Sequence, residues 1–151
     1  MKNHKNRSTK GQSLFEVVLS LAVITVVIVA LIILASNAIR NTTFSKNKTL
    51  ATRYSQEAME WLRGERDADW DVFSVRALIP TYCLPSLSWT AASVGTCSDN
   101  DVLPGTTLKR EITFTSVSSD NIEISVIVYW TDAQGLHEVR SITNLTDWRV
   151  Q

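Results

Sequence analysis

The residues of this 151-residue chain that could do chemistry lie near its start and in its middle. Near the start, Gly11 ends a basic run, and a single carboxylate, Glu16, stands just before a long apolar run. A lone carboxylate at the edge of an apolar segment is costly unless it is paired, so Glu16 is a candidate functional residue. In the middle, Cys83 and Cys97 could form a disulfide.

Catalytic chemistry has little support in the sequence. After the apolar run His137 is the only histidine, so a catalytic triad would depend on one residue inside an expected strand. Because His137 alternates with Leu136 and Glu138, we expect it on the solvent face of that strand. No phosphate-binding loop, HExxH motif or dinucleotide fingerprint occurs. We therefore predict that the chain is not an enzyme and has no cofactor.

Two acidic segments are candidate cation sites. Residues 67–71 place aspartates at alternate positions, as an EF-hand loop does, but the required Gly and Glu are replaced by Val72 and Leu78. We interpret this segment as a solvated turn after a helix. Residues 99–101 could also sit in a cation-binding loop, but a turn before Pro104 explains them more simply. We predict no metal site in either segment.

The element that must position Glu16 is the apolar run. Residues 17–39 carry no charge. As a helix rising about 1.5 Å per residue, residues 17–35 span roughly 28 Å, close to the thickness of a bilayer core. We therefore predict one membrane span. The basic residues before it predict a cytoplasmic N-terminus; they are Lys2, Lys5, Arg7 and Lys10.

The charges are distributed unevenly. The chain has fifteen basic and fifteen acidic residues, and four of the basic ones precede the apolar run. The segment after the run is therefore mildly acidic, which argues against a nucleic-acid partner.

The expected export of this segment bears on the two cysteines. A disulfide between Cys83 and Cys97 is the simplest interpretation in an oxidising compartment. The closed loop of about 15 residues would contribute about 3 kcal/mol. A structural zinc site is excluded because the sequence does not supply the four ligands that it needs. In a reducing cell envelope the two cysteines would stay as free thiols.

The junction between the basic residues and the apolar run reads KGQSLFEVVL. It resembles the prepilin signature of type IV pilins and type II secretion pseudopilins. In that family a membrane peptidase cuts after a glycine and methylates the new N-terminus. The resemblance implies that residues 1–11 are the leader and that Lys10, Gly11 and Gln12 form the processing site. It also implies that Glu16 pairs with the terminal amine of a neighbouring subunit. Gln12 departs from the family's usual Phe, and we still expect cutting.

The resemblance also implies the partners and the location of the chain. The partners would be other pilin or pseudopilin subunits, the prepilin peptidase, the inner-membrane assembly platform and membrane lipid, without nucleic acid. The chain would span the inner membrane once and then enter an extracellular filament. Many major pilins carry a proline in the apolar half of the helix, and residues 12–79 have none. A minor pilin or pseudopilin therefore fits better.

Three alternatives stay open at this point. A signal peptide cut after residues 36–38 would release a body that starts at Ile39. An uncut single-pass anchor would carry an extracellular binding module. Glu16 could also serve only within its own chain, in a capping box with Ser13 as the N-cap.

The expected fold class is α+β and pilin-like, with a long N-terminal helix packed on a small antiparallel sheet. The stripe of Leu50, Tyr54, Ala58, Trp61 and Leu62 predicts an amphipathic helix half that faces this sheet, with a stop at Gly64.

Alternating apolar residues predict an antiparallel meander of three strands. The strands are expected at residues 107–118, 122–131 and 136–145. The resulting organisation is a leader (1–11), a membrane half of the helix (12–39), an amphipathic half (40–66), a connecting region with Cys83 and Cys97 (67–106) and the meander (107–151).

Overall fold

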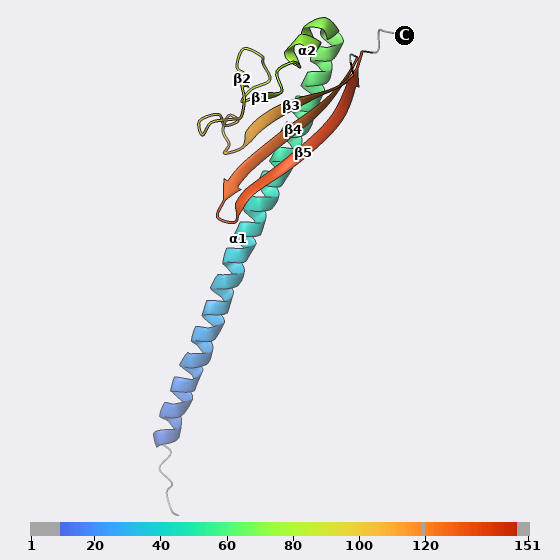
Figure 1. The fold of residues 1–151 in the computed structure, drawn as a ribbon. Helices are drawn as coiled ribbons and strands as arrows, with labels where there is room; N and C mark the ends of the chain where they lie inside the picture. Colours follow the sequence, from blue (N-terminus) through green and yellow to red (C-terminus); the bar gives the residue numbers. More distant parts are fainter. Residues whose placement is uncertain (1–9, 119, 148–151) are drawn as a thin grey trace, which may run out of the picture. The chain divides into compact units, whose positions relative to one another are not determined.

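The structure is a computed structural model that describes residues 10–118 and 120–147. Side-chain environments are described from Leu14 onward, except at Val117. Residues 1–9 of the predicted leader lie outside the described part. The chain divides into two compact units, Met1–Thr43 and Phe44–Gln151. Figure 1 shows its helices and strands.

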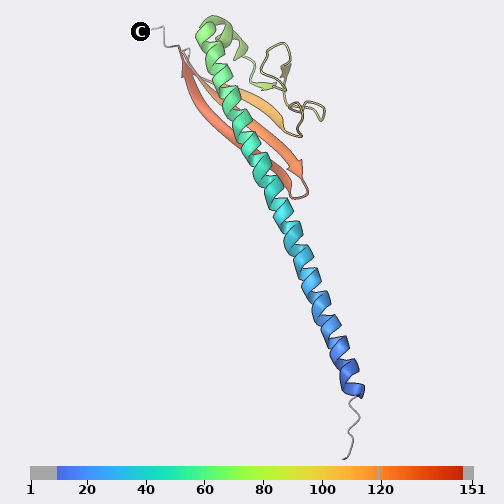
Figure 2. The same cartoon turned by 180° about the vertical axis from the view of Figure 1, so that it is seen from behind.

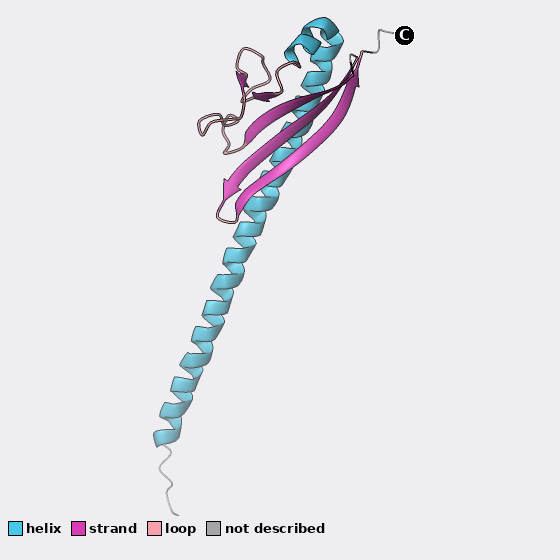
Figure 3. Cartoon of the chain, in the orientation of Figure 1, coloured by secondary structure: helices cyan, strands magenta, loops and turns pink. Residues whose placement is uncertain are grey.

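The helix α1 runs from Lys10 to Ala68 and so contributes to both units (Figure 3). The predicted stop at Gly64 is wrong, because the helix continues for one more turn. A single glycine costs a helix only about 1 kcal/mol. Tertiary contacts hold the surrounding turn: the ring of Trp61 packs on Trp89, whose indole N–H donates to the carboxylate of Glu65.

In the first unit every described side chain from Leu14 to Thr43 is exposed. The helix in this unit carries the one candidate membrane span found among the described residues. The predicted apolar span is therefore present as a helix without any covering layer of its own.

The second unit contains a five-stranded antiparallel sheet in the order β2-β1-β3-β4-β5. The strands are β1 (Thr81–Cys83), β2 (Ser93–Val94), β3 (Lys109–Ser118), β4 (Asn121–Asp132) and β5 (Gly135–Thr146). The predicted meander is confirmed as β3, β4 and β5. The short strands β1 and β2 extend the sheet beyond it and were not predicted.

The C-terminal part of α1 lies across one face of this sheet, and the core of the unit lies between them (Figure 2). The helix contributes a buried face of mostly small residues: Ala51, Ser55, Ala58, Met59 and Leu62. Of the predicted stripe, Ala58 and Leu62 are buried, while Leu50, Tyr54 and Trp61 pack at the margin of the core. Strand β4 contributes alternate residues, as predicted: Ile122, Ile124, Val126, Val128 and Trp130.

A short helix, α2 (Trp70–Arg76), replaces the solvated turn predicted after α1. Asp69 is its N-cap and accepts a hydrogen bond from the backbone N–H of Val72 at 3.1 Å. The rings of Trp70 and Phe73 are buried, and Phe73 packs edge-on against Phe114 of β3. Of the three alternate aspartates, Asp69 therefore caps α2, while Asp67 lies in α1 and Asp71 in the first turn of α2.

Candidate functional site

The predicted processing junction lies in the first turn of α1. Lys10, Gly11 and Gln12 are all within the helix, and the structure describes their backbone only. Because α1 begins at Lys10, Ser13 is inside the helix and cannot be its N-cap, a position that needs a non-helical backbone. The capping-box alternative for Glu16 is therefore wrong.

Glu16 is exposed and lies one turn beyond this junction. Its backbone carbonyl accepts a hydrogen bond from the Ser20 hydroxyl at 2.7 Å. No other charged residue follows in the sequence before Arg40. The carboxylate is thus the only charge on this stretch of an otherwise apolar helix, and it needs a partner or water once the helix is in lipid.

The apolar side chains that follow Glu16 are exposed on all sides of the helix. Their exposed fractions run from 50% at Val27 to 69% at Val26. A helix that is apolar all round needs a surrounding of lipid or of other helices. This bare surface and Glu16 make the first unit a candidate assembly surface.

The second unit joins its sheet to α1 through a buried cation. Arg110 in β3 is 2% exposed and points toward α1, as the alternation of its strand predicts. Its guanidinium donates from Nε to the carbonyl oxygen of Leu84 at 3.1 Å and from Nη1 to the carbonyl oxygen of Tyr54 at 3.2 Å. Burial lowers the pKa of Arg110, and the nearby carboxylate of Glu57 opposes this shift.

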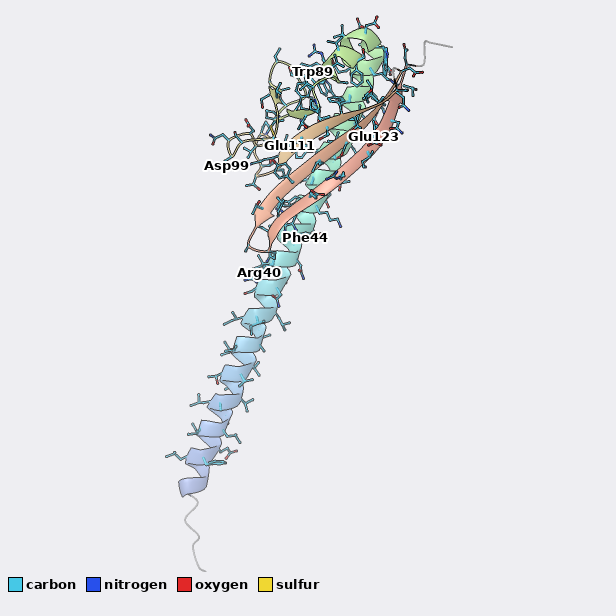
Figure 4. The ribbon with its side chains drawn as sticks, viewed as in Figure 1. Arg40, Phe44, Trp89, Asp99, Glu111 and Glu123 are labelled. Atoms are coloured by element: carbon cyan, nitrogen blue, oxygen red, sulfur yellow. A yellow bond between two sulfur atoms is a disulfide. The ribbon has the colours of Figure 1, made fainter. Side chains whose placement is uncertain are left out.

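The predicted disulfide between Cys83 and Cys97 is present, with a Cα–Cα distance of 4.8 Å. It joins the end of β1 to the loop that leads to β3. The same loop is held by Glu111, whose carboxylate accepts from the backbone N–H of Cys97 at 2.8 Å and from the Tyr129 hydroxyl at 2.7 Å (Figure 4). Burial and this hydrogen bond raise the pKa of Tyr129.

The acidic segment 99–101 lies in the same loop, and its side chains hold the loop through an ion pair and hydrogen bonds. Lys109 forms an ion pair with Asp99 at 2.9 Å, and Asp101 accepts from the backbone N–H and the hydroxyl of Ser98 at 2.8 and 2.6 Å. These hydrogen bonds lower the pKa values of Asp99 and Asp101. Among the described residues no cluster of three or more metal-ligating side chains occurs.

His137 lies on the face opposite to the predicted one. It faces α1, where its ring packs edge-on against Phe44 and at a tilt against Trp130. Its Nε2 lies 2.9 Å from a carboxylate oxygen of Asp132. The outer face of β5 carries Leu136 instead. The prediction of a solvent-facing histidine is therefore wrong.

Sequence reasoning missed two groups of the second unit. The sequence gives Arg110 no evident role, although a single arginine among buried strand residues indicates a specific partner. Trp89 received no assignment, yet it packs against Trp61 and Tyr82 and lies beneath the guanidinium of Arg76, 4.7 Å from its ring centre. No spacing motif in the sequence marks that cluster.

Comparison with known proteins gives no match to a family model, to a curated protein or to a solved structure.

Proposed function

We propose that this chain is a structural subunit of a type IV pilus or of a type II secretion filament, in the manner of a minor pilin or pseudopilin. A prepilin peptidase cuts the chain after Gly11. The cut chain stays in the inner membrane through α1 and then enters the filament through the same helix.

One observation carries this proposal. The sequence that resembles the prepilin signature stands at the start of a helix that runs unbroken from Lys10 to Ala68. The first unit exposes its apolar side chains on all sides, whereas the second unit has a core of its own. An anchored binding module would also need a bare apolar helix and a separate core, so the prepilin-like junction at the start of α1 is the feature that favours the filament subunit.

The bare helix supports a role in packing against other helices. In lipid, helices associate through close packing and through polar pairs, because the hydrophobic effect does not favour association there. Glu16 supplies a charge for such a pair. Its partner would be the terminal amine of Gln12 in a neighbouring subunit, and pairing would neutralise both charges. That contact would fix the stagger between adjacent helices.

The absence of proline from residues 12–79 supports a minor subunit or pseudopilin over a major pilin. Proline would remove one helical hydrogen bond and allow a kink in the apolar half. The helix of this chain has no such point in its described part.

Incorporation into filaments tests the proposal. The full chain is expressed in a host that supplies a prepilin peptidase and an assembly platform, and sheared filaments are assayed for it. We expect the chain in the filament fraction. Glu16→Ala should keep membrane insertion and lower incorporation about tenfold or more, because removing one partner of a buried ion pair costs several kcal/mol. Glu123→Ala removes a carboxylate from the outer face of β4 and should incorporate normally.

The proposal fails if the unaltered chain stays in the membrane while a control subunit assembles. That result would favour the anchored binding module. Normal incorporation of Glu16→Ala would overturn the role of Glu16 alone.

A further inference from the structure

Strand β5 forms an open edge of the sheet. It is the last strand in the order and pairs only with β4, in a register that runs without a bulge from Asp132↔Gly135 to Asn121↔Thr146. On its other side, alternate backbone N–H and C=O groups have no strand to bond within the described residues. The opposite edge of the sheet, β2, is only two residues long.

Several of the usual protections of an edge are absent from β5. The strand is twelve residues long and contains no proline. Its helix-facing positions, from Gly135 to Leu145, carry no Lys, Arg, Asp or Glu. Two large apolar residues on its outer face, Leu136 and Ile142, are 65% and 59% exposed. A long edge of this kind is a template for a further strand.

The residues on the outer face of β5 indicate which strand could pair with it. Its alternate residues are apolar, acidic, basic and apolar: Leu136, Glu138, Arg140 and Ile142. Consider a second β5 laid antiparallel beside the first, with Val139 of each copy opposite the other. Glu138 of each copy then lies opposite Arg140 of the other, and Leu136 of each lies opposite Ile142. Directly opposed pairs of both kinds stabilise a sheet.

The neighbouring registers are disfavoured. If the two strands crossed their symmetry axis at residue 138, the two copies of Glu138 would lie opposite each other. If they crossed it at residue 140, the two copies of Arg140 would lie opposite each other. An axis between two residues would place helix-facing side chains beside outward-facing ones. Within one copy, Glu138 and Arg140 form only a half-exposed ion pair at 3.5 Å, so both side chains can turn to a neighbour at little cost.

We propose that β5 pairs with β5 of a second copy of this chain, antiparallel about a two-fold axis at Val139, so that the sheet continues from one copy into the other. The axis reverses the direction of the strand. The contact therefore joins oppositely directed copies, from two assemblies or from a free pair, and not neighbours in one parallel array. It does not depend on prepilin processing.

Charge exchange tests this contact. The uncut full chain is purified in detergent micelles, and its association is measured by sedimentation equilibrium over a range of concentrations. We expect a dimer. Glu138→Arg and Arg140→Glu each set like charges opposite each other twice per interface, and each should weaken dimerisation about tenfold. The double variant Glu138→Arg/Arg140→Glu restores opposite charges and should dimerise like the unaltered chain.

Two controls make the result specific. Glu123→Arg changes the charge on the outer face of β4, away from the edge, and should leave the dimer unchanged (Figure 4). The far-ultraviolet circular dichroism of each variant reports whether the sheet is intact. A monomeric unaltered chain would overturn the proposal. So would a dimer that survives both single exchanges, as one formed through α1 would, or a double variant as weak as the singles.

Discussion

The guanidinium of Arg110 in β3 donates a hydrogen bond to the backbone carbonyl oxygen of Tyr54 in α1, with a donor–acceptor distance of 3.2 Å. The same side chain bonds to the carbonyl of Leu84, next to the disulfide-bonded Cys83. One buried cation thus connects the helix, the sheet and the start of the disulfide loop. Burying a charge costs free energy, and these hydrogen bonds offset the cost of burying the Arg110 guanidinium.

Arg110 allows a test of how much its charge matters. Arg110→Ala removes the bonds and leaves a cavity, so we expect it to lower the free energy of unfolding by about 3 kcal/mol. Arg110→Met fills most of the volume without a buried charge and should lose less than about 1.5 kcal/mol. Urea unfolding followed by tryptophan fluorescence measures both. Equal losses for the two variants would show that the hydrogen bonds, and not the packing, dominate.

The disulfide should contribute through the unfolded chain. Its cysteines are 14 positions apart, and closing a loop of that size stabilises a fold by about 3 kcal/mol. We expect the double variant Cys83→Ser/Cys97→Ser to lose about that much in urea unfolding. Cys83 is fully buried, so the folded protein should resist mild reductant. Unfolding curves that are identical with and without the disulfide would contradict this prediction.

The loop that follows Cys97 should weaken in acid. Two hydrogen bonds from Ser98 lower the pKa of the Asp101 carboxyl below its ordinary value of 3.8 in the folded state. The bond from the hydroxyl has the larger effect, and the bond from the backbone N–H has the smaller one. A carboxyl whose folded pKa is lowered stabilises the fold above its unfolded pKa and loses that contribution as pH falls through the folded value. Stability should therefore be level from neutral pH down to about pH 5 and decline below about pH 4.

The variant Asp101→Asn isolates the contribution of this carboxyl. It should be less stable than the unaltered chain at neutral pH and should lose less stability on acidification. Urea midpoints at a series of pH values give the comparison. A decline as steep in the variant as in the unaltered chain would assign the acid sensitivity to other groups.

The sequence predicted the parts of the fold that follow from periodicity. Apolar alternation located β3, β4 and β5 to within about two residues, and the run without proline located α1. The short strands β1 and β2 lack enough residues to show a period. They are strands because β3 offers them an edge, which is a tertiary effect.

Alternation did not determine the side that each strand buries. In β5 the outer positions hold Leu136 and Ile142, while the inner ones hold His137 and Ser141. The inner positions also hold Val139 and Leu145, so both faces of β5 are mixed and alternation alone does not identify the buried one. The polar inner residues have specific partners on α1. The Ser141 hydroxyl accepts a hydrogen bond from the Ser55 hydroxyl at 2.8 Å, and His137 packs against Phe44.

The candidate site was predictable to a different extent in each unit. Two cysteines in a segment that is expected to be exported allow one intramolecular pairing, so the disulfide could be predicted. The hydrogen bonds from Arg110 to Leu84 and from Trp89 to Glu65 join residues more than twenty positions apart and have no signature in the sequence. The assembly role of Glu16 depends on a second chain, and it stays a prediction.

The most direct test of the central claim is the intact mass and N-terminal sequence of the chain, co-expressed with and without a prepilin peptidase. The account predicts a peptidase-dependent start at Gln12, with or without an added methyl group, and no cutting of the matched variant Gly11→Leu. A start at Ile39 would instead mean an ordinary signal peptide. That result, or an uncut chain beside a control substrate that the same peptidase cuts, would contradict the account.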